Sequence, residues 1–166
     1  MASTEPKFIC DDHCGRLARW LRFIGFDCLH DQSETNSHLL RKAAGEDRVI
    51  LTRDHCLAAK TLARQVILLA SADPLIQLRE VLEASSLTVE SGRFLTRCTI
   101  CNERIETIDT STVWDRIPPH VQRTRTEFRL CNSCGRIYWK GTHVERMLER
   151  LRAAGLEAGG TRPPSV

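Results

Sequence analysis

The sequence contains no apolar stretch that approaches the length of a membrane span, which needs about 20 predominantly apolar residues. Residues 1–7 also contain no apolar signal region. Four of the eight cysteines, Cys10, Cys14, Cys28 and Cys56, lack any paired spacing, and a free cysteine commonly behaves as a small buried hydrophobe. We therefore expect a protein of the reducing cytoplasm that does not contact membranes.

The other four cysteines form two Cys-x-x-Cys knuckles, Cys98/Cys101 and Cys131/Cys134. Each knuckle places two thiolates on one tight turn, and two such turns supply the four ligands of a closed tetrahedral zinc site. A catalytic zinc usually keeps one coordination position open for water, and a four-thiolate site has none. The spacing therefore predicts one structural zinc ion, with any chemistry elsewhere in the chain. Two disulfides are the alternative interpretation.

The net charge of +3 conceals an uneven distribution along the chain. Residues 1–92 carry 11 Lys and Arg against 13 Asp and Glu, whereas residues 93–166 carry 13 against 8. Four thiolates with Zn²⁺ would reduce the positive charge of the second part without reversing it. A mildly acidic part joined to a basic zinc module suits a nucleic-acid partner.

Residues 1–92 alternate short apolar runs with amphipathic segments. Strands are predicted at residues 7–10, 26–30, 48–51 and 65–69, and helices at residues 14–25, 34–44, 57–63 and 74–85. Gly25 and Gly45 are expected to end the first two helices. This alternation is typical of a parallel α/β sheet with helices on both faces, which binds ligands at the carboxyl ends of its strands.

The second part of the chain follows a different pattern. Strands are predicted at residues 93–97, 127–130 and 136–139, beside the two knuckles. Thr142 and Glu145 have the spacing of a capping box, and the apolar residues that follow form one face of a closing helix. The expected organisation is an α/β domain over residues 1–92, a zinc module over residues 93–154 and a disordered tail over residues 155–166.

Acidic residues follow three of the predicted strands. Asp11 and Asp12 follow the first strand, Asp31 the second and Asp54 the third, so all are expected at one edge of the sheet. Carboxylate oxygens at such an edge are suited to Mg²⁺ or Mn²⁺. Asp is also a favoured N-cap residue, so helix capping is an equal alternative from the residues alone.

Cationic and aromatic side chains offer candidates for RNA contacts. The candidates are Arg16, Arg19, Arg53, Arg136, Tyr138 and Lys140. Arginine forms bidentate bonds to phosphate, and aromatic rings beside cations suit base stacking. A solvated helix face is the alternative for the arginines, and it is the interpretation that we adopt for Arg22. Trp20 lies on the apolar stripe and is expected in the core.

Several blocks of the sequence resemble one family. KFICD at residues 7–11, GRLARWLR at residues 15–22 and VILTRD at residues 49–54, followed by the two knuckles, are similar to the Mut-seven C-terminal ribonuclease domain family. The resemblance covers residues 7–150. It implies a PIN-like nuclease fold joined to a four-cysteine zinc ribbon, and RNA cleavage by carboxylates that hold Mg²⁺ or Mn²⁺.

The resemblance also implies roles for single residues. Asp11 and Asp54 correspond to metal ligands. The resemblance leaves Asp12 open, and the chemistry of metal-assisted hydrolysis assigns Asp12 or Glu34 to complete the catalytic site or to orient water. The chain departs from the family pattern at Asn36, where an acidic residue is usual, although Asp31 and Glu34 are near. The leading prediction is a cytoplasmic metal-dependent ribonuclease. The alternatives are a non-catalytic RNA- or ribosome-associated protein with an incomplete site, and a protein-interaction module.

Overall fold

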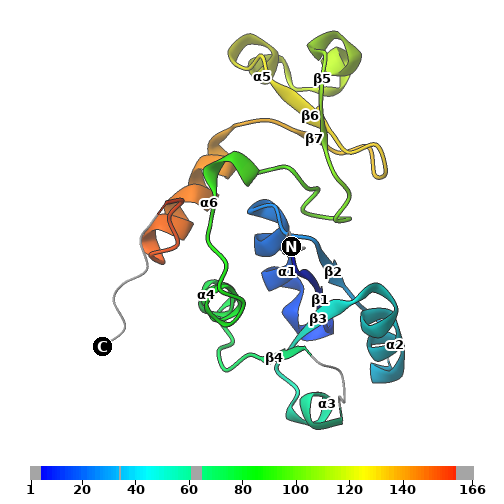
Figure 1. Cartoon of the computed structure of the whole chain (residues 1–166). Coiled ribbons are helices and arrows are strands. Elements are labelled where there is room, and N and C mark those ends of the chain that lie inside the picture. The colour runs from blue at the N-terminus through cyan, green and yellow to red at the C-terminus, as the bar shows by residue number, and fades with distance from the viewer. Residues whose placement is uncertain (1–4, 34, 61–64, 160–166) are drawn as a thin grey trace.

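The four apolar runs of the first part form one parallel sheet. The computed structural model describes residues 5–33, 35–60 and 65–159 (Figure 1). The strands are β1 (Lys7–Cys10), β2 (Cys28–His30), β3 (Arg48–Thr52) and β4 (Val66–Leu68). Their order in the sheet is β2-β1-β3-β4, and every neighbouring pair is parallel. The predicted parallel α/β sheet is confirmed.

Helices cover both faces of this sheet. They are α1 (Gly15–Phe23), α2 (Asn36–Glu46), α3 (His55–Lys60) and α4 (Pro74–Ala84), and Figure 1 shows α2 and α4 on opposite sides. Phe8 and Leu51 share one buried cluster with α1 and α4, whereas their neighbours Ile9 and Ile50 pack with α2 and α3. Successive residues of a strand point to opposite faces, so these short strands are apolar on both sides.

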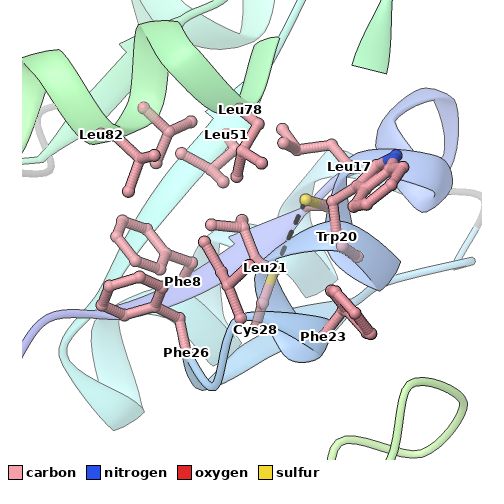
Figure 2. Close-up of a cluster of buried hydrophobic side chains, with 14 of the residues drawn as sticks. Phe8, Leu17, Trp20, Leu21, Phe23, Phe26, Cys28, Leu51, Leu78 and Leu82 are labelled. Carbon is pink, nitrogen blue, oxygen red and sulfur yellow. Dashed lines mark hydrogen bonds between the residues drawn. The ribbon is translucent and has the colours of Figure 1, made fainter. Parts of the chain in front are cut away.

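The larger cluster joins β1, α1 and α4 (Figure 2). Trp20 and Leu21 of α1 lie in it, and the predicted core position of Trp20 is confirmed at 5% exposure. Gly25 follows α1 with φ +96°, and a Cβ there would lie 2.7 Å from the carbonyl oxygen of Arg93. This position therefore requires glycine.

Two predicted features of α2 and α6 are wrong. Gly45 lies inside α2, and the helix ends where Asp47 adopts a left-handed conformation at φ 50°, which Asp tolerates better than most residues. The helix α6 (Thr142–Ala153) begins after Gly141, which takes the N-cap position in extended conformation with no side-chain cap bond. Thr142 is therefore inside the helix and forms no capping box.

The second part of the chain builds a small antiparallel sheet. Its elements are η2 (Ser91–Arg93), β5 (Glu106–Ile108), η3 (Thr110–Arg116), α5 (Pro119–Thr124), β6 (Phe128–Leu130) and β7 (Ile137–Tyr138), followed by α6. The strand order is β5-β6-β7, and α6 packs its apolar face, including Leu151, against the larger core cluster. The strands predicted beside the second knuckle are confirmed.

The strand predicted at residues 93–97 is wrong. Leu95 has φ 54°, and its N–H donates to the carbonyl of Phe23 at the end of α1 instead of to a strand. A single bridge between Arg97 and Arg104 is the extended pairing found in this segment. The segment therefore packs against the end of α1 and leads into the first knuckle.

Buried polar bonds join the first knuckle to the parallel sheet. Arg22 is 5% exposed, and it donates to the carbonyls of Cys28 and Ile100, each at 2.7 Å. The solvated position predicted for Arg22 is therefore wrong. Asn102 accepts from the N–H of Cys28 at 3.0 Å and donates to Asp27 at 2.8 Å.

The predicted domain limits at residues 92 and 154 remain predictions, and residues 160–166 of the predicted tail lie outside the described residues.

Replacing Asn102 by alanine is expected to destabilise the protein by about 2–4 kcal/mol. The substitution leaves the buried N–H of Cys28 without its acceptor, and alanine must adopt the left-handed conformation that Asn102 has at φ 72°. Urea unfolding of the zinc-loaded protein measures the change. Asn132→Ala is the matched control, because the exposed Asn132 side chain donates to exposed Glu106 and has no other side-chain bond among the described residues, so it should change stability by less than about 0.5 kcal/mol. Equal stability of both variants would contradict the bridging role of Asn102.

Candidate functional site

The carboxyl ends of β1 and β3 form the centre of the candidate site. These strands are neighbours, and β2 lies beyond β1 whereas β4 lies beyond β3, so the chain order reverses between them. Such a switch point opens a crevice outside the strand ends, where parallel sheets bind ligands. Asp11 directly follows β1, and Thr52 is the last residue of β3.

Thr52 links Asp11 with Asp54. The Thr52 hydroxyl, which is fully buried, donates to Asp11 Oδ2 at 2.5 Å and accepts from the N–H of Asp54 at 2.9 Å. Asp11 is 6% exposed and also accepts from the N–H of His13 at 3.1 Å. A single hydroxyl thus fixes the orientation of the Asp11 carboxylate and the backbone position of Asp54.

Both aspartates also accept bonds from backbone N–H groups two residues ahead. Asp11 caps the 3-10 turn η1 (Asp12–Cys14), and Asp54 accepts from Cys56 at 2.7 Å at the start of α3. The capping alternative is therefore correct for both residues. A carboxylate has about four acceptor positions, so capping leaves room for a further ligand.

Asp11, Asp12 and His13 form a group that can hold a metal ion. One ligand atom from each lies within 4.8 Å of the others, and Asp12 Oδ1 is 2.6 Å from His13 Nδ1. His13 is not among the residues predicted for the site, although a histidine directly after two aspartates at a strand end is a usable signal. Asp54 does not belong to this group, and Glu34 lies outside the described residues.

Asp31 follows β2 at the same edge but is occupied by a different partner. It is 8% exposed, with Oδ2 at 3.1 Å from His38 Nδ1 and Oδ1 accepting from the N–H of Ser33. Burial raises the pKa of Asp31, but the bonds from His38 and Ser33 outweigh burial and hold that pKa below its usual value. Asp31 is therefore an ionised partner of His38, and nearby Asn36 is exposed at the start of α2.

Two buried thiols, Cys10 and Cys14, interact with Asp11. Burial, and then the Asp11 carboxylate, raise the pKa of Cys14 to about 12. Burial also raises the pKa of Cys10, whose sulfur lies 3.6 Å from that of Cys28. Since a metal ligand or nucleophile must be a thiolate, these protonated thiols act as core side chains, as predicted for them. The core position predicted for Cys56 is wrong, because Cys56 is exposed.

The four knuckle cysteines form a second cluster that can hold a metal ion. Their sulfur atoms lie within 4.8 Å of one another, with Cys98 and Cys134 3.6 Å apart and Cys101 and Cys131 3.4 Å apart. A tetrahedral zinc with bonds of about 2.3 Å places its sulfur ligands about 3.8 Å apart, whereas a disulfide requires about 2.05 Å. All four are free cysteines, so the donor set fits zinc and not two disulfides.

The two knuckles have matching backbones. Asn102 and Gly135, each directly after the second cysteine, adopt left-handed conformations at φ 72° and 71°. The hydroxyl of Tyr138 lies 3.0 Å from Cys98 Sγ and accepts from the N–H of Thr99. Burial raises the pKa of Cys98, but hydrogen bonds from the Cys101 backbone and from Tyr138 outweigh burial and lower it to about 6. A thiolate at Cys98 suits a metal ligand.

The predicted RNA-binding residues fall into three places. Arg16 and Arg53 are exposed and adjoin the acidic edge in sequence. Arg19 and Arg136 line one groove, Lys140 lines a neighbouring one, and Tyr138 lines both. Their positions alone do not test contact with RNA, so the role of these residues stays a prediction.

In the described part of the chain, no helix has the length and apolar character needed to cross a bilayer.

Comparison of the sequence with curated proteins and with solved structures finds no match. A family model described as the Mut7-C RNAse domain matches residues 6–151. This span covers nearly the whole chain and includes the acidic edge and both knuckles. The chain therefore belongs to the Mut7-C RNAse domain family, as the resemblance of its sequence blocks indicates.

Proposed function

We propose that the protein is a metal-dependent ribonuclease that hydrolyses phosphodiester bonds of RNA at the acidic edge of its parallel sheet. Membership of an RNAse domain family supports a nuclease-like function. The observation that carries the proposal is the group of Asp11, Asp12 and His13, which lies at the strand-order reversal with ligand atoms within 4.8 Å. In this proposal the α/β part is a PIN-like domain.

The residues at the edge have separate tasks in this proposal. Asp11 and Asp54, which follow neighbouring strands and are linked through the Thr52 hydroxyl, hold Mg²⁺ or Mn²⁺ in this proposal, with Asp12 completing the site. The ion, when bound, supplies positive charge beside the phosphate and activates water as the nucleophile. Thr52 holds Asp11 in one orientation, which suits a ligand that must not move. Arg16 and Arg53 are exposed beside the edge and bind phosphate oxygens of the RNA.

The zinc module has a structural task and helps to bind RNA. The four cysteines hold one zinc ion and leave no open position for water. Arg136 and Lys140, which are exposed beside the second knuckle, offer positive charge to the RNA backbone. All eight cysteines are free, which suits the reducing cytoplasm expected from the sequence.

Replacing Asp54 by asparagine is expected to reduce metal-dependent cleavage about 10- to 100-fold. The new amide keeps an oxygen that can accept from Cys56 and so keeps the start of α3, but it loses the negative charge that attracts the cation. The measurement is cleavage of a labelled single-stranded RNA by zinc-loaded protein with Mn²⁺ or Mg²⁺. Asp73→Asn, at the N-cap of α4, is the matched control and should cleave like the wild type. Equal cleavage by the Asp54 variant would remove Asp54 from the site.

A non-catalytic RNA-binding protein is the second candidate function. Two observations favour it: Asn36 supplies no carboxylate at the start of α2, and Asp31 is engaged by His38. Absence of cleavage with either cation, combined with retained RNA binding, would favour this candidate over the ribonuclease.

A further inference from the structure

A groove of about 460 Å³ lies between the two parts of the chain. It is lined from α1, from the first knuckle, from α5, from the β7 segment and from the start of α6. The side chains that matter for its chemistry are Arg19, His120, Arg136, Tyr138, Trp139 and His143. These residues are far apart in sequence, and the packing of the zinc module on α1 brings them to one place. The volume is in the range typical of small-ligand sites.

The charge of this groove has one sign. Arg19, His120, Arg136 and His143 are exposed, and none of their side chains has a hydrogen-bond or ion-pair partner among residues 5–33, 35–60 and 65–159. None of the described residues that line the groove carries a carboxylate. The larger neighbouring groove of about 880 Å³ differs, because Glu127, Glu145 and Glu157 line it together with its cations. The smaller groove is therefore suited to an anion.

Aromatic rings in the groove are held in place. The Tyr138 hydroxyl contacts Cys98 and Thr99, so the first knuckle fixes its ring. Trp139 packs on Phe128 with ring centroids 6.3 Å apart, and a Cβ on Gly141 would lie 2.9 Å from the indole nitrogen. Rigid rings beside unpaired cations are the combination with which single-stranded nucleic acids are bound, by base stacking and phosphate contact.

The helix α1 connects the groove with the acidic edge. Arg16 and Arg19 are both exposed and are three residues apart, so they lie on the same side of the helix. Arg16 is in the first turn of α1, beside the Asp11–His13 group, whereas Arg19 lines the groove. At a rise of about 1.5 Å per residue, Arg19 is about 6 Å along the axis from the start of α1. One extended strand can contact both places.

We propose that this groove binds a phosphate and base of single-stranded RNA, next to the segment presented to the acidic edge. That the RNA strand runs along α1 from the groove to the acidic edge rests on the proposed ribonuclease function. Binding in the groove does not, since it needs only the cations and rings described above. A base stacks on Tyr138 or Trp139, and a phosphate binds between Arg19 and Arg136.

The test is binding of a fluorescently labelled oligouridylate to the full-length, zinc-loaded protein, without added Mg²⁺ or Mn²⁺. Arg19→Ala and Arg136→Ala should each weaken binding about tenfold or more, because each removes a charge-assisted bond to phosphate. Each should also lower the slope of log affinity against log salt by about 0.7, the value for one phosphate contact on a single strand. Arg146→Ala is the matched control, since exposed Arg146 of α6 does not line the groove.

The outcomes separate this proposal from the ribonuclease. Weaker binding by both groove variants, with unchanged binding by the Arg146→Ala variant, supports the groove even if no protein cleaves RNA. Equal effects of the Arg19, Arg136 and Arg146 substitutions would indicate diffuse attraction and overturn it. Unchanged RNA binding by both groove variants would also overturn it. If these variants kept RNA binding but lost binding of an acidic peptide that the wild type binds, the groove would be a site for a protein partner. Thermal unfolding confirms that each variant is folded.

Discussion

Replacing Cys131 by serine is expected to unfold most of the chain and not only the small antiparallel sheet. Cys98 and Cys131 are fully buried in the same hydrophobic cluster as Phe8 of β1 and Leu21 of α1. Structural zinc contributes about 10–16 kcal/mol in small zinc-finger peptides, whereas a whole domain is stable by about 5–15 kcal/mol. Loss of the ion would therefore remove support comparable with the total stability. Circular dichroism and zinc content measure both effects on the same samples.

The chain provides a matched control for this experiment. Cys56 is exposed and does not belong to either candidate metal group, so Cys56→Ser should keep the zinc content and the unfolding temperature of the wild type. A strong zinc chelator should reproduce the effect of Cys131→Ser in the wild type. A Cys131→Ser protein that lacks zinc but unfolds at the temperature of the wild type would show that the site is not structural.

The parallel sheet could be predicted because its signal is local. The strands β1 and β3 are apolar on both faces, and each is followed by a helix with an apolar stripe, as in α1 with Leu17 and Leu21. A central parallel strand is buried on both faces, so the apolar composition of these strands and their alternation with helices were sufficient to predict the sheet. The two knuckles are equally local, since the spacing within each pair fixes its turn.

The failures depend on partners that are distant in sequence. The helical pattern puts Arg22 on the face of α1 opposite the apolar stripe, but its guanidinium donates to the carbonyl of Ile100, 78 residues later. Leu95 leaves the predicted strand because its N–H finds the carbonyl of Phe23. No periodicity within either segment contains this information, because a hydrogen bond between distant segments exists only after the chain has folded.

The candidate site shows why capping and metal binding could not be separated from sequence. Asp11 and Asp54 have the local environment of N-caps, and both do accept backbone bonds. What distinguishes Asp11 is its shared bond with Thr52, which is 41 residues away on the neighbouring strand. Asp12 and His13 join Asp11 only through the turn η1, whose geometry brings three consecutive side chains together.

Replacing Asp11 by asparagine is expected to reduce metal-dependent cleavage by about 100-fold or more. Residues that only orient metal ligands lose about 10- to 100-fold when mutated, so a buried direct ligand should lose at least the upper value. Asp11 is 6% exposed, which leaves little room for water to replace its carboxylate, whereas Asp54 is half-buried. The effect should therefore exceed that of Asp54→Asn. Initial cleavage rates across a series of Mn²⁺ concentrations measure it.

Thr52→Val tests whether orientation of Asp11 matters, because valine has the shape of threonine without its hydroxyl. The Asp11 carboxylate loses its donor and the Asp54 N–H loses its acceptor. We expect cleavage to fall about 10- to 100-fold at limiting Mn²⁺, with partial recovery at high Mn²⁺, because ligand orientation governs metal affinity. Thr52→Ser is the control and should retain most activity, since it keeps both hydrogen bonds. A purely structural Thr52 would lower stability without changing the Mn²⁺ concentration needed for half-maximal cleavage.

The three substitutions together distinguish a metal site from a pair of helix caps. If Asp11 and Asp54 only cap η1 and α3, Asp11→Asn and Asp54→Asn keep an accepting oxygen, and Thr52→Val loses stability alone. None of the three would then alter the Mn²⁺ dependence of any activity. If the edge holds a cation, the Mn²⁺ requirement rises in all three, and most in Asp11→Asn. Asp11→Asn should have the larger effect of the two aspartate substitutions, because Asp11 is buried and Asp54 is half-buried, so water can replace the Asp11 carboxylate less readily.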